Sequence, residues 1–274
     1  MFHLTNKPKE VNKAMARVTA ILNLKGGVAK TTTAINLAAI LAKEHGAKVC
    51  VVDGDSQCNT TEFFGGDPTS GNLAMVLRNA ERVFEPGAYA AGFIQKTVYE
   101  NVDILPGDET LMDMDLSKVE SGTVNSNVLR YLVEEVKDKY THILIDCPPA
   151  FNAASAAALV AADDVIIPIK LDAFSLRGMA NLMRQILNMR KINPRLKLAG
   201  CLPTMWYADD QIQEAEDQLR KAGLPVFPHI RHSRKVDDMT FKQEPLLISS
   251  PRSGAGIDYR RFVAEYVGGV SYGI

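Results

Sequence analysis

The sequence predicts an α/β fold, a doubly wound and mostly parallel sheet with helices on both faces. Short apolar runs of strand length, such as 18–24 and 49–52, alternate with longer segments whose apolar residues recur at helical spacing. The runs are unbroken rather than alternating, which is typical of parallel strands buried on both faces. They end in glycine or aspartate, and the ligands of such sheets collect at the carboxyl ends of the strands.

The composition is that of an ordinary globular domain. With 274 residues, of which 46% are apolar and 23% charged, the chain can bury a substantial core. We expect residues 18–274 to form a single domain and the polar, basic residues 1–17 to form a flexible extension. The four cysteines form no C-x-x-C pair, which indicates a reduced, cytoplasmic protein.

The charge is distributed unevenly along the chain. The net charge of −1 gives no indication of nucleic acid for the protein as a whole. Residues 53–120 nevertheless carry 13 acidic and 4 basic side chains, whereas residues 220–261 carry 9 basic and 4 acidic ones. One end of the molecule is therefore predicted to present a positive surface.

A glycine loop joins the first predicted strand, 18–24, to the first predicted helix, 32–44. Gly26 and Gly27 lack a Cβ atom, so the backbone can turn tightly and direct consecutive N–H groups at one anion. The positive end of the following helix adds to that attraction. The order of strand, glycine turn and helix predicts a phosphate-binding loop.

Two side chains of this loop suit the phosphates and the metal of a nucleotide. Lys30 can reach the β- and γ-phosphates, and the Thr31 hydroxyl can bind Mg²⁺. The standard pattern G-x-x-x-x-G-K-[ST] is not met, because Leu24 and Ala29 occupy its glycine positions. The chain has K-G-G-x-x-K-T-T instead, which begins with a second lysine, Lys25.

This motif resembles the deviant Walker A motif of the ParA/MinD ATPases, a group of P-loop NTPases. In that family the first lysine, here Lys25, reaches across an ATP-sandwiched dimer to the partner's nucleotide. Most members have glycine in place of Ala29, and the extra methyl group is tolerated if φ is negative there. The resemblance implies ATP and Mg²⁺ as cofactors and Lys25 and Lys30 as catalytic residues. The nucleotide-binding residues that it implies are Lys25, Gly26, Gly27, Val28, Ala29, Lys30, Thr31 and Thr32.

The second predicted strand, 48–53, delivers two carboxylates to the same edge of the sheet. The corresponding family element reads D-x-D-P-Q, and its second aspartate positions the attacking water. The resemblance gives that catalytic role to Asp55 and places Asp53 nearer the Mg²⁺ shell, while Ser56 replaces the usual proline. The alternative is a solvated strand end without a ligand.

A predicted helix over 124–139 leads to the apolar run 140–146, which ends in Asp146. A buried strand that ends in aspartate is the Walker B arrangement, in which the carboxylate holds Mg²⁺. The following D-C-P-P matches the family closely. Cys147 has no neighbouring histidine or cysteine in the sequence and is predicted to serve packing.

The rest of the chain continues the alternation, although residues 58–101 are poorly patterned. The remaining predicted elements are strands at 101–107, 164–169 and 197–203 and helices at 153–162, 175–191, 209–222 and 257–267.

Residues 226–235 resemble the last strand of the family and the basic turn after it, which grips DNA phosphates without reading bases. Arg231, Arg234 and Lys235 are the DNA-binding residues that this resemblance implies, and the local excess of basic residues supports them. The alternative is a solvated basic turn. A DNA-contacting arginine that relatives often carry just after the preceding strand is absent, since Asp209 lies there.

The resemblance covers residues 18 to about 268 and implies a ParA-type partition ATPase with weak intrinsic turnover. Its ATP-bound homodimer would coat DNA non-specifically, associate with the nucleoid and be stimulated by a ParB-like partner. The cargo could be a plasmid, a chromosome, a mobile element or another cargo. The sequence does not name it.

Three other functions remain open at this stage. A MinD-like positioning ATPase on a membrane or scaffold is disfavoured, because the tail 270–274 is neither long nor charged enough for a membrane-binding helix. No membrane partner is therefore expected. A metal-cluster ATPase like the nitrogenase iron protein lacks suitably placed cysteines. A tyrosine-kinase relative lacks a cluster of tyrosines in its tail.

Overall fold

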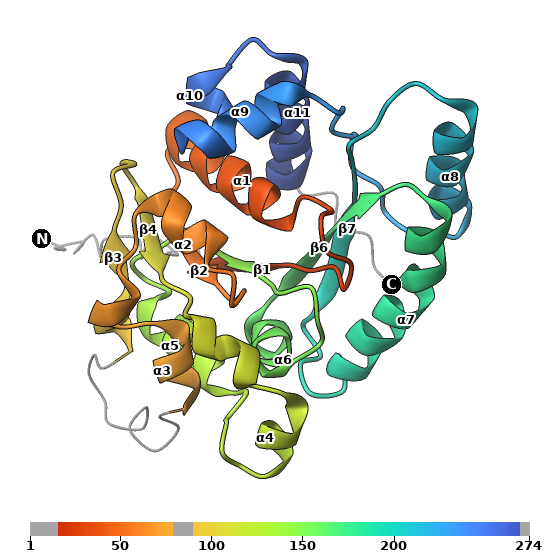
Figure 1. Ribbon diagram of the computed structural model, residues 1–274. Coiled ribbons are helices and arrows are strands. Elements are labelled where there is room, and N and C mark those ends of the chain that lie inside the picture. The colour runs from red at the N-terminus through yellow and green to blue at the C-terminus, as the bar shows by residue number, and fades with distance from the viewer. Residues whose placement is uncertain (1–15, 79–89, 269–274) are drawn as a thin grey trace, which may run out of the picture.

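A seven-stranded sheet runs through the middle of the protein, with helices on both sides (Figure 1). The computed structural model describes residues 16–78 and 90–268. The strands are β1 Arg17–Ile21, β2 Val49–Asp53, β3 Gln95–Lys96, β4 Val102–Leu105, β5 His142–Asp146, β6 Asp164–Lys170 and β7 Lys197–Thr204. They lie in the order β3-β4-β2-β5-β1-β6-β7, and every neighbouring pair is parallel except β3 with β4. The predicted fold class is confirmed.

Helices cover both faces of the sheet, as the alternation of strands and helices predicts. The face that carries α1 also carries α2, α9, α10 and α11, while α3, α5, α6, α7 and α8 pack on the other face. The helices are α1 Lys30–His45, α2 Asn59–Phe64, α3 Leu73–Arg78, α4 Leu116–Glu120, α5 Val128–Val136, α6 Ala153–Ala161, α7 Ala173–Met189, α8 Asp210–Lys221, α9 Arg234–Lys242, α10 Leu246–Ser249 and α11 Gly254–Gly268.

The apolar strands explain why two separate cores form. Successive side chains of a strand point to opposite faces, so an unbroken apolar run contributes to both cores. In β2, Cys50 and Val52 lie in one core, and Val49 and Val51 lie in the other. Helices on either side complete each core and bury β2 entirely.

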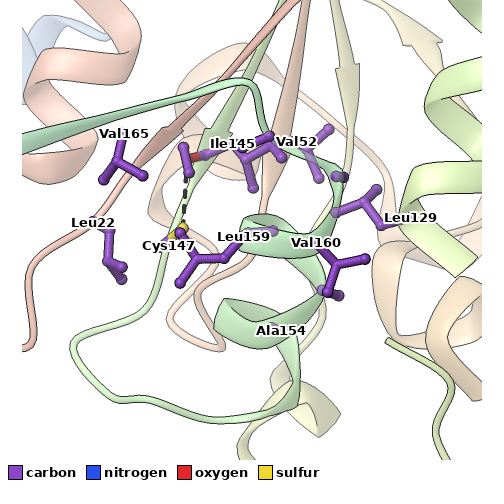
Figure 2. Packing of buried hydrophobic residues seen from close by; sticks show 14 of the residues in the cluster. Leu22, Val52, Leu129, Ile145, Cys147, Ala154, Leu159, Val160 and Val165 are labelled. Atoms are coloured by element: carbon purple, nitrogen blue, oxygen red, sulfur yellow. Dashed lines mark hydrogen bonds between the residues drawn. The ribbon is translucent and has the colours of Figure 1, made fainter. Parts of the chain in front are cut away.

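Cys147 packs in the core beneath the sheet, as predicted (Figure 2). Its side chain lies near Leu22 and Leu159, and its thiol donates to the Ile145 carbonyl at 3.7 Å. Burial raises the pKa of this thiol above its ordinary value, which makes it a poor nucleophile.

Two features differ from the sequence prediction. The poorly patterned region contains the short antiparallel edge strand β3. The predicted last strand is wrong: between 226 and 231 only isolated bridges form, Cys201 with Val226 and Trp206 with Arg231. Pro228 lies between them and has no N–H group to donate to a ladder. The predicted basic turn is the first turn of α9.

The predictions for the two ends of the chain fall largely outside the described residues. This holds for residues 1–15 of the predicted extension and for the tail 270–274. At the start of the described chain, Ala16 is buried and β1 begins at Arg17. Among the helices of residues 16–78 and 90–268, none has both the length and the apolar character needed to cross a membrane.

Candidate nucleotide-binding site

The loop between β1 and α1 opens onto a cavity of about 430 Å³ at the carboxyl edge of the sheet. The first turn of α1 contains no acidic residue, and its N-cap, Ala29, offers no side-chain acceptor. The first N–H groups of this helix therefore have no side-chain partner, and together with the helix dipole they favour an anion. The cavity is lined by Gly26, Gly27, Val28, Ala29, Lys30, Thr31, Thr32, Asp55, Gln57, Asn59, Pro149, Thr204, Met205, Ile230, Arg231, His232, Ser233, Val236, Asp237, Thr240 and Tyr259.

Ala29 has a left-handed backbone conformation, with φ of 65° and ψ of 34°. The negative φ that would accommodate the extra methyl group without strain is therefore not present at this position. A Cβ atom in this conformation approaches the carbonyl oxygen of its own residue, which costs about 1–2 kcal/mol. Thr204 at the end of β7 helps to fix the loop, since its hydroxyl donates to the Val28 carbonyl at 3.2 Å.

Replacing Ala29 with glycine is expected to raise the free energy of unfolding by up to about 1 kcal/mol. Glycine removes the left-handed strain, while the greater freedom of the unfolded chain offsets part of the gain. Urea denaturation of the nucleotide-free protein measures the difference. Ala39→Gly, inside α1, is the control and is expected to destabilise the protein. If Ala29→Gly lowers the free energy of unfolding as much as Ala39→Gly does, the backbone of Ala29 is not strained.

Lys30 lies almost entirely inside the site, with 7% of its surface exposed. Its ammonium group donates to the Lys25 carbonyl at 3.2 Å. Burial lowers its pKa, and the nearby carboxylates of Asp146 and Asp55 partly offset that effect. A buried ammonium with this single carbonyl bond is well placed to pair with phosphate oxygens.

Asp146 lies at the end of β5 directly beneath the loop and is fully buried. Its Oδ2 atom accepts hydrogen bonds from the hydroxyls of Thr31 and Thr60, each at 2.7 Å. Its Oδ1 atom is buried and has no hydrogen-bond partner. A buried carboxylate oxygen without a partner is costly, and a cation would satisfy it.

Asp53 lies beside Asp146 in the sheet, paired with it in register. Its Oδ2 atom accepts from both the backbone N–H and the hydroxyl of Thr61, at 2.8 and 2.7 Å. Its Oδ1 atom accepts from the Asp55 N–H at 3.1 Å. Because Asp53 is already satisfied by the chain, the geometry favours Asp146 as the metal-linked acid.

The residues present fit Mg²⁺. Oxygen ligands suit this ion, which usually keeps several waters and binds one or two carboxylates together with substrate phosphates. Thr31 and Asp146 offer a hydroxyl and an unsatisfied carboxylate oxygen at the foot of the loop. Within the described part of the chain no group of three or more His, Cys, Asp or Glu side chains could hold a metal alone. A magnesium ion here would need the phosphates of a nucleotide.

Burial raises the pKa values of Asp53 and Asp146 above the ordinary carboxyl range, and repulsion by the Asp146 carboxylate adds to the rise at Asp53. Where folding raises the pKa of an acid, the folded state binds more protons, so stability falls as pH rises through the raised pKa. Metal-free protein should therefore lose stability between mildly acidic and neutral pH.

Stabilisation by Mg²⁺–ATP is expected to be greater at about pH 7.5 than at about pH 5.5. At the lower pH the cation must displace protons from this carboxylate pair, whereas at neutral pH it relieves their repulsion. Thermal melts with and without Mg²⁺–ATP at both pH values measure the difference. Asp146→Asn is expected to remove most of it. A shift that is the same at both pH values in the wild type would contradict the prediction.

Lys25 does not line the cavity. Its ammonium pairs with the Asp172 carboxylate at 2.6 Å and donates to the Ser175 hydroxyl at 3.1 Å, at the start of α7. Although partial burial opposes ionisation of Asp172, hydrogen bonds from Lys25 and Ser175 lower its pKa to about 2. Asn23 fixes the backbone of the loop, because its Oδ1 atom accepts from the Lys25 N–H.

The structure separates the three basic residues predicted to bind DNA. Arg231 lines the cavity, and its guanidinium forms two hydrogen bonds to Asp258, at 2.7 and 2.9 Å. Arg234 and Lys235 lie exposed in the first turn of α9, where Lys235 pairs with Asp238 at 2.9 Å. All three side chains are exposed, but only Arg234 and Lys235 lie on α9.

Several residues that shape the site were not identified from the sequence. Asp172 and Ser175 hold Lys25, and Thr60 and Thr61 hold the two buried carboxylates. A local signal existed for the first pair, since aspartate three residues before serine at a strand-to-helix junction is typical of an N-cap. The second pair follows the D-x-D element after four residues, and the sequence alone does not show which aspartate each hydroxyl reaches.

The amino-acid sequence is similar to a known family and to individual known proteins. The family AAA_31, described as an AAA domain, matches residues 16–198. The chain is 32% identical over 259 residues to the chromosome partitioning protein ParA of Caulobacter vibrioides, covering 92% of this chain and 94% of that protein. It is 32% identical over 247 residues to the sporulation initiation inhibitor protein Soj of Bacillus subtilis, covering 87% and 93% respectively.

Solved structures share the architecture. A Cyanothece McdA(D38A)–ATP complex superposes with a TM-score of 0.78 at 22% identity, covering 95% of this chain and all of that one. Cobyrinic acid a,c-diamide synthase of Mycobacterium smegmatis with bound ADP and magnesium gives 0.74 at 28% identity, covering 91% and 93%. Since the family match spans more than half of the chain, and ParA and Soj match it over most of their length, the chain belongs to the ParA-type partition ATPases.

Proposed function

We propose that this protein is an ATP-dependent DNA partition ATPase that binds Mg²⁺–ATP at the loop between β1 and α1. The observation that carries the nucleotide chemistry is the unpartnered, buried Oδ1 atom of Asp146 beneath a helix N-terminus without a side-chain cap. Lys30 would hold the β- and γ-phosphates, and Thr31 and Asp146 would hold Mg²⁺. The ion would neutralise charge that develops on the phosphates.

Other residues around the cavity would orient the attacking water, contact the base and hold the loop. Asp55 lines the cavity and would orient the attacking water. The apolar side chains of Met205 and Val236 line the same cavity, as is usual where a ligand carries a base. Thr204 and Asn23 would keep the loop in place during binding.

Lys25 would act in a homodimer rather than in its own cavity. In the single chain its ammonium is paired with Asp172, outside the residues that line the site. ATP would favour a dimer in which each Lys25 leaves Asp172 for the partner's nucleotide, and ADP would favour the monomer. Such a switch is a population shift, set by the difference in nucleotide affinity between the two states.

The ATP-bound dimer would bind DNA through phosphate contacts of Arg234 and Lys235, with a ParB-like partner stimulating hydrolysis. Support comes from the exposed position of both residues at the start of α9 and from the name of the Caulobacter relative. The protein would then lie on the nucleoid in the cytoplasm. The DNA that the ParB-like partner binds, chromosome or plasmid, would determine the cargo.

Binding to random-sequence duplex DNA, with ATP, with ADP and without nucleotide over a salt series, tests this proposal. Binding should require ATP and weaken steeply with salt, because it releases counterions from the phosphates. It should fall in Arg234→Ala/Lys235→Ala. The matched control is Lys139→Ala/Lys221→Ala, which removes two exposed positive charges from other elements.

The main alternative is a positioning ATPase of the MinD kind that acts on a membrane or scaffold. The same experiment separates the two functions. If the protein dimerises with ATP but does not bind DNA even at low salt, the partition hypothesis is refuted. The proposed ATP-dependent dimerisation would still stand. Co-sedimentation with liposomes would then test the membrane surface.

A further inference from the structure

Thr60 is fully buried in α2, next to the carboxylate of Asp146. Its hydroxyl donates to Asp146 Oδ2 at 2.7 Å, across 86 residues of sequence. A buried threonine hydroxyl needs a partner, and here that partner is the carboxylate of the Walker B strand. Thr60 is not among the residues that line the cavity.

The hydrogen bonds of Asp146 are divided unequally between its two oxygens. Oδ2 accepts from Thr31 and from Thr60, whereas Oδ1 has no partner. Two donors on the same oxygen fix the rotation of the carboxylate and leave the other oxygen free and fully buried. A metal that binds Oδ1 then meets a ligand that is already oriented.

The two hydroxyls on Oδ2 differ in what happens when the site fills. Thr31 lies in the phosphate loop, and its own oxygen is expected to bind Mg²⁺. Thr60 lies on α2, outside the cavity, and can keep the same bond throughout. Its neighbour Thr61 anchors this segment, since its hydroxyl donates to Asp53 and accepts from the Gly107 N–H at 2.8 Å.

We propose that Thr60 is a positioning residue for Mg²⁺, which holds Asp146 through Oδ2 so that Oδ1 is presented to the ion. This inference rests on the Mg²⁺–ATP site proposed above. Removing a hydrogen bond that orients a metal ligand typically weakens metal affinity about 10- to 100-fold. Thr60→Val, which has nearly the same shape, should therefore raise the Mg²⁺ concentration needed for half-maximal nucleotide binding by about that factor.

The test is a titration of Mg²⁺ against the fluorescence of a ribose-labelled ATP analogue bound to the full chain, with EDTA as the metal-free reference. The comparison includes wild type, Thr60→Val and Thr60→Ser. Serine keeps the hydroxyl and loses only a methyl group, so it should restore most of the Mg²⁺ affinity that Thr60→Val loses. Binding in EDTA should be the same in all three proteins, because the phosphate loop is unchanged.

The outcomes separate this inference from the proposal on which it rests. If wild type shows no Mg²⁺-dependent nucleotide binding, the site itself is refuted. If wild type responds to Mg²⁺ and Thr60→Val matches it, or Thr60→Ser is as weak as Thr60→Val, the role of Thr60 is refuted while the site stands. Thermal melts report whether each variant is folded. Should Thr60→Val not fold, Thr60→Ala is compared with Thr60→Ser in its place.

Discussion

Replacing Lys25 with glutamine is expected to abolish the ATP-dependent dimer while leaving ATP binding to the monomer nearly unchanged. The Lys25 side chain lies outside the cavity, and only its carbonyl takes part in the site, as the acceptor for Lys30. In a symmetric dimer each nucleotide would lose one charge-assisted hydrogen bond, worth about 1.5–3 kcal/mol. Two such losses weaken dimerisation by about two to four orders of magnitude.

Sedimentation with a non-hydrolysable ATP analogue measures the dimer, and the labelled nucleotide measures binding to the monomer. Asp172→Asn is the matched control, because asparagine can still cap α7 through the Ser175 N–H, which Asp172 now binds at 2.8 Å. It removes the charge that pairs with Lys25, so this variant should dimerise at least as readily as wild type. A Lys25→Gln protein that dimerises normally with ATP would show that Lys25 has no role between subunits.

The arrangement of the active edge could be predicted because it follows from rules of strand order and burial. Unbroken apolar runs had to be central parallel strands, and their carboxyl ends had to meet at one edge. The loop residues Lys30 and Thr31 and the strand-end residue Asp146 therefore come together as expected, with a hydrogen bond from Thr31 to Asp146. The place of each of these residues in the fold follows from its local sequence and from the order of the strands in the sheet.

What could not be predicted depends on side-chain direction and on long-range packing. The pairing of Lys25 with Asp172, 147 residues away, has no signal in the local sequence, and the role of Lys25 at a partner's nucleotide stays a prediction. The backbone conformation of Ala29 is imposed by the loop against the preference of alanine. The segment around Pro228 lacked the periodicity that separates a strand from irregular chain, so its resemblance to a last strand was misleading.

Replacing Asp55 with asparagine is expected to reduce ATP hydrolysis by about 10²- to 10⁴-fold, the usual contribution of a positioned acid–base group. Asp55 lines the cavity, and its Oδ1 atom accepts from the Gln57 N–H at 3.1 Å, a bond that asparagine can also make. The turn should therefore keep its shape while the carboxylate that orients water is lost. Neither Lys30 nor Asp146 bonds to Asp55, so nucleotide and Mg²⁺ binding should change little.

Single-turnover hydrolysis with the nucleotide prebound separates this chemical step from binding. Because hydrolysis ends the ATP-bound state, Asp55→Asn should also prolong the dimer and its hold on DNA, in contrast to Lys25→Gln, which should never form that dimer. Gln57→Ala is the control, since its side chain lines the same cavity without a carboxylate. Hydrolysis at the wild-type rate in Asp55→Asn would assign the water to another group. A loss of ATP binding would instead show that Asp55 stabilises the loop. If Asp55→Asn prolongs the dimer and Lys25→Gln neither dimerises nor hydrolyses ATP, the two results together would indicate that the dimer is the state that hydrolyses ATP.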